Sequence, residues 1–230
     1  MNHTRRVVNR LLHAGWRWID RMGEIVPGTR AAEEFGTFGA ASAIDFPPAT
    51  ILNPGSMHLG TGVLVGRHVT LSVGYGVDDP GAPARGLVIG DGAVIGTRST
   101  ITAHESIEIG ADVFFGQSVL VTDASHGYQD PHLPIGKQFG THMPVSIGPG
   151  SWIGHGAVIL PGAQIGRNCV VAAGAVVRGE VPDFSVVAGN PARVIRHLDP
   201  DVGWVGRSGD VRPVLDSLQP QAPTPDPVVS

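Results

Sequence analysis

The stretch IGPGSWIGHGAVILPGAQIGRNCVV, residues 147–171, decides the fold. A large aliphatic side chain returns at every sixth position, at Ile147, Ile153, Ile159, Ile165 and Val171, and glycine follows three of the four isoleucines. An amphipathic helix would repeat its apolar positions every 3.6 residues, and a half-buried strand every two. A period of six instead indicates short strands joined by tight corners, each corner sending one branched side chain inward. Glycine after that side chain tolerates a positive φ and lets neighbouring backbones approach closely.

The same six-residue unit, here called a hexad, recurs upstream in residues 59–71, 89–101 and 109–121. Three hexads, about 18 residues, would close one triangular coil, and stacked coils would bury the aliphatic residues in continuous ladders. The pattern therefore predicts an all-β solenoid, in which Cys169 is a buried small residue rather than a reactive thiol. Small residues occupy the fifth place of many hexads: Ala93, Ser99, Ser151, Ala157, Ala163, Cys169 and Ala175.

One long segment, residues 122–146, interrupts the repeat and carries His126, His132 and His142. Loops of this length inside a compact domain are usually functional or disordered. The segment leaves the repeat directly after Val121, so its first residues are attached to a rigid corner. His126 lies five residues beyond Val121 among small and polar neighbours, which makes it a candidate for a positioned, partly exposed imidazole.

Two segments resemble a known family. Residues 147–196, which begin IGPGSW and end PARVIR, resemble the hexapeptide-repeat acyltransferases, whose fold is a left-handed parallel β-helix. Residues 122–131, TDASHGYQDP, resemble the corresponding stretch of the sugar and exopolysaccharide O-acetyltransferase branch, related to the maltose and galactoside acetyltransferases. The resemblance covers roughly residues 38–197. It implies a left-handed coil, an exception to the usual right-handed crossover, and a homotrimer with its sites in the clefts between subunits.

The resemblance implies an enzyme that moves an acetyl group from acetyl-CoA to a hydroxyl of a sugar or glycan, by direct attack on the thioester. By this resemblance, His126 occupies the family's catalytic position. A histidine, with an ordinary pKa near ~6.5, suits a general base that takes the hydroxyl proton. Asp123 is expected to orient the imidazole, bind a sugar hydroxyl or cap the loop. By the same resemblance, Arg98 and His104 lie toward the acceptor, whereas the other two loop histidines are expected at the surface.

The resemblance also implies where coenzyme A binds. It places a pantetheine groove along small residues of neighbouring coils, and it places arginines near the phosphates, where guanidinium–phosphate pairing is favourable. A purely structural role for Gly154 and Ala173, and a solvated charge for Arg196, are the alternatives. The predicted groove residues are Trp152, Gly154, His155 and Ala173, and the predicted phosphate-binding residues are Arg178, Arg193 and Arg196.

The two ends of the chain lie outside the repeat. Residues 1–37 are predicted to form an amphipathic helix and a linker, 38–197 the solenoid, and 198–230 a Pro-rich disordered tail. The helix would pack on the solenoid or on a neighbouring subunit, or contact a membrane surface weakly, because five arginines lie mostly opposite its apolar face. The apolar residues at helical spacing are Val8, Leu11, Leu12, Trp16, Ile19 and Met22.

Composition excludes several other classes of protein. The net charge is −4 and only 16% of residues are charged, so no basic field calls for nucleic acid. A single cysteine rules out an internal disulfide and fits a reducing, cytoplasmic location. No apolar run reaches the ~18 residues that span a bilayer.

Other functions stay open at this stage. The acceptor could be the amine of an amino sugar instead of a hydroxyl. The same repeat also builds metalloenzymes like the γ-class carbonic anhydrases, which need three histidines on one metal ion. No metal is expected here, because the histidines at 104, 126, 132, 142 and 155 lack tight ligand spacing. A non-catalytic scaffold is the remaining alternative.

Overall fold

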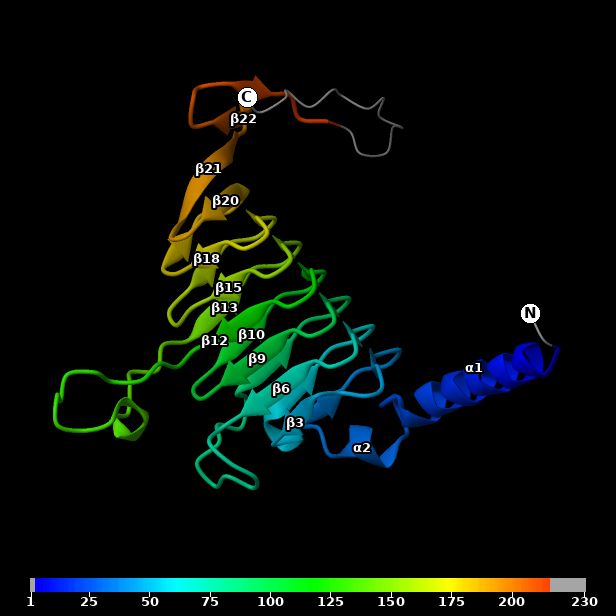
Figure 1. The fold of residues 1–230 in the computed structure, drawn as a ribbon. Helices are drawn as coiled ribbons and strands as arrows, with labels where there is room; N and C mark the ends of the chain where they lie inside the picture. Colours follow the sequence, from blue (N-terminus) through cyan, green and yellow to red (C-terminus); the bar gives the residue numbers. More distant parts are fainter. Residues whose placement is uncertain (1–2, 216–230) are drawn as a thin grey trace.

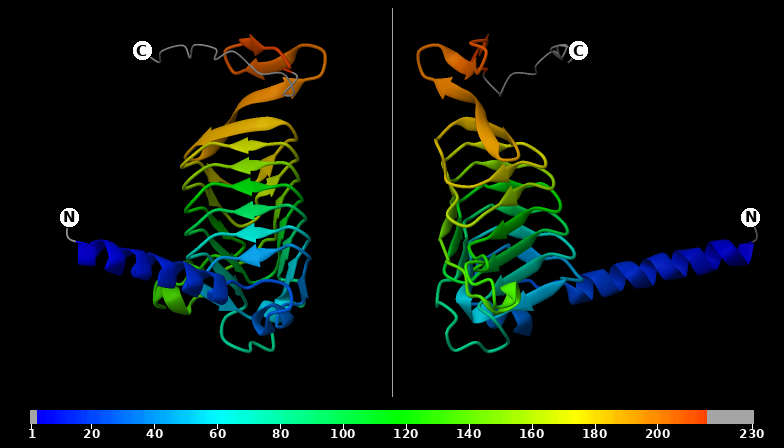
Figure 2. Two further views of the ribbon diagram at one scale, coloured as in Figure 1. Left: turned by 90° about the vertical axis from the view of Figure 1, so that its right-hand side faces the viewer. Right: turned by 60° about the vertical axis from the view of Figure 1, so that its left-hand side comes forward.

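A computed structural model describes residues 3–215 as a three-sided parallel β-helix, with a helix leaving one end and a hairpin extending the other (Figure 1). Each coil contributes one short strand to each of three sheets, and successive coils pair in parallel register. The stacked arrows of Figure 2 show this layering. Paired strands in a sheet generally lie about 4.8 Å apart. The prediction of an all-β solenoid is confirmed.

The three sheets contain seven, ten and six strands. The first sheet is formed by β1 (Thr37–Phe38), β4 (Met57–Leu59), β7 (Leu87–Ile89), β10 (Ile107–Ile109), β13 (Val145–Ile147), β16 (Gln164–Ile165) and β19 (Glu180–Val181). The third is formed by β3 (Thr50–Leu52), β6 (Thr70–Val73), β9 (Thr100–Ala103), β12 (Leu120–Thr122), β15 (Val158–Ile159) and β18 (Val176–Val177).

The second sheet continues beyond the coils. Its coil strands are β2 (Ala43–Ile44), β5 (Leu64–Val65), β8 (Val94–Ile95), β11 (Phe114–Phe115), β14 (Trp152–Ile153), β17 (Val170–Val171) and β20 (Ser185–Gly189). The antiparallel strands β21 (Ala192–Asp199), β22 (Gly203–Gly206) and β23 (Val211–Arg212) then extend it. The short helical elements are α2 (Arg30–Glu33), η1 (Pro54–Ser56) and η2 (Ile135–Lys137).

The core is built from the aliphatic ladders that the period of six predicts. In the first sheet Ile89, Ile109, Ile147 and Ile165 lie in register on four successive coils, and all are buried. Each such side chain contributes about 1.5–3 kcal/mol by leaving water. The small fifth-place residues are buried beside them, including Cys169, whose thiol pKa is raised by burial.

The corners use glycine differently from the prediction. The glycine that follows the aliphatic residue is needed for close approach, since a Cβ at Gly148 would lie 2.5 Å from the backbone nitrogen of Arg167. The positive φ instead falls two residues later, as at Gly150 with φ 70°. Arg98 and Asn168, with φ of 61° and 49°, occupy the same place in their hexads. The left-handed corner therefore accepts residues other than glycine.

The predicted disordered tail begins too early. Residues 198–212 fold as part of the β21–β23 hairpins, in which the Arg196 guanidinium pairs with Asp210 and donates to the Trp204 carbonyl at 2.8 Å. Side chains along β21 alternate in exposure, so this segment has a period of two and not the period of six that marks the coils. Residues 216–230, also predicted to be disordered, lie outside the described residues.

At the other end, α1 (His3–Gly23) leaves the solenoid as a separate rod (Figures 1 and 2). Its last turn is attached to the first coils. Asp20 accepts a 2.9 Å hydrogen bond from Arg67, and Ile25 bridges Ile44 just beyond the helix. Within residues 3–215, α1 and the other helices are all too short or too polar to cross a bilayer.

Candidate active site

A cavity of about 320 Å³ lies along one edge of the prism, where the third sheet turns into the first. We call this the loop edge, because two long segments leave the coils there: residues 74–86 between β6 and β7, and residues 123–144 between β12 and β13. Between them, residues 104–106 make a short turn from β9 to β10. Strands β6, β9 and β12 are neighbours in the third sheet, so three successive coils line the cavity.

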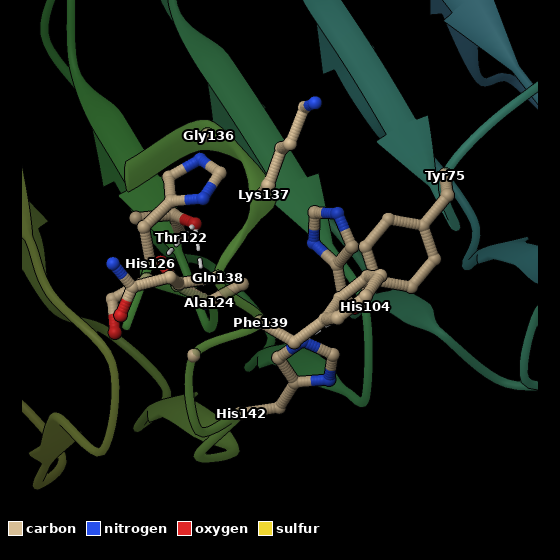
Figure 3. A pocket seen from close by; sticks show the side chains of 12 residues that line it. Tyr75, His104, Thr122, Ala124, His126, Gly136, Lys137, Gln138, Phe139 and His142 are labelled. Carbon is tan, nitrogen blue, oxygen red and sulfur yellow. Dashed lines mark hydrogen bonds between the residues drawn. The ribbon is translucent and has the colours of Figure 1, made fainter. Parts of the chain in front are cut away.

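Each of these coils sends aromatic or imidazole side chains into the cavity. Tyr75 comes from the first segment, His104 from the short turn, and His126, Phe139 and His142 from the long segment. Figure 3 shows His126 on one side and Tyr75, His104 and His142 together on the other. Rigid strand ends thus bring side chains from positions 75 to 142 into one site.

Asp123 fixes the start of the long segment. Its side chain is 0% exposed and accepts 2.8 Å hydrogen bonds from the backbone N–H groups of His104 and Glu105 on the adjacent coil. Of the three predicted roles, the structure shows the capping role. The carboxylate is buried among these N–H groups and the His104 ring and does not line the cavity, and the other two roles stay predictions.

His104, Tyr75 and His142 form what we call the imidazole cluster. The Tyr75 ring packs edge-on against the His104 ring at 4.5 Å, and the Tyr75 hydroxyl lies 2.7 Å from Nε2 of His142. Burial lowers the pKa of His104; the Asp123 carboxylate opposes this shift and His142 adds to it. His104 Nδ1 is buried without a hydrogen-bond partner, 3.8 Å from the Asp123 carboxylate. His142, expected at the surface, is a half-buried wall of the site.

His126 is exposed on the cavity wall and is positioned by its own loop. It forms an isolated antiparallel bridge with Phe139, and the following N–H, of Gly127, donates to the Gln138 carbonyl at 3.1 Å. The Gln138 side chain is buried and makes three hydrogen bonds to the backbone of Asp130 and Leu133. Sequence reasoning missed Gln138, because one glutamine in a polar loop carries no spacing signal.

The predicted donor-site residues lie elsewhere on the prism. Trp152, Gly154, His155 and Ala173 gather where the second sheet turns into the third. Gly154 stacks closely on the next coil, since a Cβ there would lie 2.5 Å from the Ala173 nitrogen. None of these four lines the cavity that holds His126. In one chain, therefore, the two predicted halves of the site occupy different edges.

The predicted arginines are dispersed. Arg98 lies at the same edge as Gly154 and outside the cavity that His104 lines in the same chain, so its predicted place toward the acceptor stays a prediction. Arg178 lies on the loop edge between β18 and β19. On β21, Arg193 is exposed, whereas the Arg196 guanidinium is committed to Asp210 and the Trp204 carbonyl. Arg196 is thus neither a freely solvated charge nor an open phosphate ligand.

A metal site finds no support in the part of the chain that the structure describes, where no three histidine, cysteine, aspartate or glutamate side chains group to hold an ion. His104 and His142 lie close, with ring centroids 5.3 Å apart, but Tyr75 completes that cluster instead of a third ligand.

Comparison with known proteins identifies the family. Residues 144–179 match the family described as bacterial transferase hexapeptide (six repeats), and residues 86–116 match the hexapeptide repeat of succinyl-transferase. The putative lipopolysaccharide biosynthesis O-acetyl transferase WbbJ of Escherichia coli is 32% identical over 157 residues, 65% of this chain and 76% of the relative. Nodulation protein L of Rhizobium meliloti is 37% identical over 55% of this chain and 73% of the relative.

Two further relatives differ in length or chemistry. A probable acetyltransferase of Mycobacterium tuberculosis is 36% identical over 48% of this chain, which spans only 37% of that protein. A variant of AntD, an N-acyltransferase from Bacillus cereus solved with dTDP and coenzyme A, superimposes with a TM-score of 0.65 at 20% identity, covering 78% of this chain and 92% of AntD. At that identity, the likeness to AntD concerns the fold.

The protein is therefore an acetyltransferase of the left-handed β-helix class. More particularly, the chain belongs to the hexapeptide-repeat acetyltransferases, as its repeat and its TDASHGYQDP segment predicted. Acetyl-CoA is the co-substrate of such an enzyme, which confirms the predicted donor. The relatives include O-acetyltransferases, whereas AntD is an N-acyltransferase.

Proposed function

We propose that the protein transfers the acetyl group of acetyl-CoA to a hydroxyl of a sugar or glycan, with His126 as the general base. The observation that carries this proposal is the exposed His126 imidazole, held on the wall of an open cavity by a loop anchored to rigid coils. The catalytic unit is then the solenoid, residues 38–197, with its extruded loop, which was expected over residues 122–146 and which the strands β12 and β13 bound at 123–144. The lone buried Cys169 is consistent with a cytoplasmic location.

The proposed reaction needs one proton acceptor and no acyl-enzyme. A His126 ring nitrogen takes the proton as the acceptor oxygen attacks the thioester carbonyl carbon. The tetrahedral intermediate collapses, its C–S bond breaks, and the imidazolium returns the proton to the leaving thiolate of coenzyme A. Backbone N–H groups would stabilise the oxyanion. The polar cavity wall, including His104, Tyr75 and His142, would contact the acceptor.

A homotrimer would unite the two halves of this site. In one chain the donor residues around Gly154 and the cavity around His126 lie on different edges, so a neighbouring chain would bring its donor groove to His126. An apolar surface supports such contact: Leu64, Phe114 and Trp152 are each about half exposed and stack in register on the outer face of the second sheet. Arg178 or Arg193 would then meet the phosphates of coenzyme A.

Steady-state kinetics of His126→Ala with acetyl-CoA test the proposal. A lost general base lowers kcat by roughly 10²–10⁴-fold, and calorimetric binding of acetyl-CoA should persist. His132→Ala is the matched control, because His132 is an exposed histidine of the same loop outside the cavity. Unchanged kcat in His126→Ala would refute the assigned role. Paired acceptors that differ only in a hydroxyl or an amine decide between O- and N-acetylation.

A further inference from the structure

The helix α1 presents an apolar face that nothing in residues 3–215 covers. Its large apolar side chains are 44–68% exposed along the whole length of the helix. Only Asp20, near the C-terminal end, is buried against the solenoid, where it meets Arg67. The expected packing of the helix on its own solenoid is therefore wrong. The exposed apolar residues are Val7, Val8, Leu11, Leu12, Trp16, Trp18, Ile19 and Met22.

The helix divides lengthwise into two faces. With 3.6 residues per turn, the apolar side chains cover about half of the circumference, and Trp16 and Trp18 lie toward its two borders. Arg6, Arg10, Arg17 and Arg21 share the opposite face, whereas Arg5, in the first turn, lies at the border that Trp16 marks. A coiled-coil seam would be a narrower stripe, with two apolar positions in each seven residues. A wide apolar half bordered by tryptophan is typical of a helix lying in a lipid interface.

The charge of α1 indicates whether a lipid bilayer or a second copy of the helix covers its apolar face. The 21 residues of α1 contain five arginines and one acidic residue, in a chain whose net charge is −4. That acid, Asp20, already pairs with Arg67 of the solenoid. Helices packed against each other would gather unpaired arginines, whereas an anionic lipid surface would neutralise them. Each arginine near such a surface strengthens binding by roughly fivefold.

We propose that α1 lies in the plane of an anionic lipid bilayer, with its apolar half among the acyl chains and its arginines at the lipid phosphates. The helix is about 31 Å long at 1.5 Å per residue, enough to hold the solenoid at the membrane surface without crossing it. The site of acetyl transfer would then operate beside the membrane. This inference does not depend on the identity of the acceptor.

Sedimentation of the full-length protein with vesicles tests this proposal. At 0.15 M salt we expect binding to vesicles of phosphatidylcholine with about a third phosphatidylglycerol, and binding at least tenfold weaker to phosphatidylcholine alone. Leu12→Asp should reduce binding at least tenfold by placing a charge in the apolar half. The double change Arg10→Glu with Arg17→Glu should reduce it similarly. Brominated lipids should quench tryptophan fluorescence in the bound protein.

Control variants keep the outcomes distinct. Val77→Asp and Arg212→Glu change an exposed apolar residue and an exposed arginine far from α1 in sequence, and both should leave vesicle binding unchanged. Absence of binding to the anionic vesicles, or equal binding by the Leu12→Asp variant, overturns the proposal. So does a Leu12→Asp variant that falls from oligomer to monomer in sedimentation velocity without lipid, because a second copy would then be the occupant.

Discussion

Gln138 should control the order of the long segment, residues 123–144, without controlling the stability of the solenoid. Its buried amide donates 2.8 Å hydrogen bonds to the carbonyls of Asp130 and Leu133 and accepts one of 3.1 Å from the Asp130 N–H. Gln138→Glu keeps the shape but removes both donors and places a carboxylate against two carbonyls. The Asp130 N–H can still donate to the carboxylate, so two hydrogen bonds are lost; at about 0.5–1.5 kcal/mol for each, the loop loses roughly 1–3 kcal/mol of local stability.

Hydrogen exchange measures this loss directly. The Gly127 N–H donates to the backbone carbonyl of residue 138, a bond that the substitution leaves in place, so its exchange reports opening of the loop. A loss of about 2 kcal/mol raises the open population, and the exchange rate with it, roughly 30-fold. Backbone amides of the coils should keep their protection from exchange, and Tm should change little. The kcat should fall, because His126 directly precedes Gly127 in the loop that opens.

Gln129→Glu is the matched control. Gln129 is exposed in the same loop and accepts a single hydrogen bond, from the Tyr128 N–H at 3.1 Å, which a carboxylate can also accept. In the Gln129→Glu variant, the exchange rate of the Gly127 amide and kcat should stay near those of the wild-type protein. Unaltered protection at Gly127 in the Gln138→Glu variant would refute the anchoring role. Exchange that spreads into β12 and β13 would refute the separation of loop and solenoid.

Two further predictions concern the buried groups behind the cavity. Asp123→Asn leaves the N–H groups of His104 and Glu105 with one amide oxygen between them, so the free energy of unfolding, measured by urea titration, should fall by roughly 1–3 kcal/mol. The control is Asp183→Asn, which weakens an exposed ion pair with Arg167. It should lower the free energy of unfolding by at most about 1 kcal/mol. Burial lowers the pKa of His104, so the unfolded chain binds the proton more readily: stability should be full above the ordinary pKa of ~6.5 and decline as pH falls toward the folded value. A His104→Gln variant that keeps the wild-type pH slope would contradict this.

The period of six made the coils predictable, because every coil repeats the same inward position. Ile109, Ile147 and Ile165 lie in one ladder. Equivalent residues of successive coils are three hexads apart in sequence, and any residues inserted at a corner add to that separation. The same arithmetic explains why one chain does not bring Arg98 and His104 together. They are six residues apart, which is one side of the triangle, so within one chain they belong to successive edges.

The interior of the cavity was less predictable, because its contacts join positions far apart in sequence. Tyr75 meets His142 across 67 residues, and neither residue belongs to a hexad. Asp123 could be foreseen as polar and close to His126, but only the stacking of β9 beside β12 shows that its carboxylate points at backbone. The role of Gln138 depends on the folded path of the loop itself, which has no repeat to fix it.

The two long insertions, residues 74–86 and 123–144, leave the same edge of the prism. Acceptor specificity can therefore change during evolution while the fold stays the same. A corner insertion leaves the strands on either side in register, as β12 and β13 still pair with the coils below and above them. Doubling the length of a loop costs only about 0.6 kcal/mol in closure entropy. Apart from Asp123, residues of the segments at 74–86 and 123–144 can therefore be inserted, deleted or substituted with little effect on the core. New acceptors can be sampled by mutation of these two segments, while the coils that both segments leave stay the same.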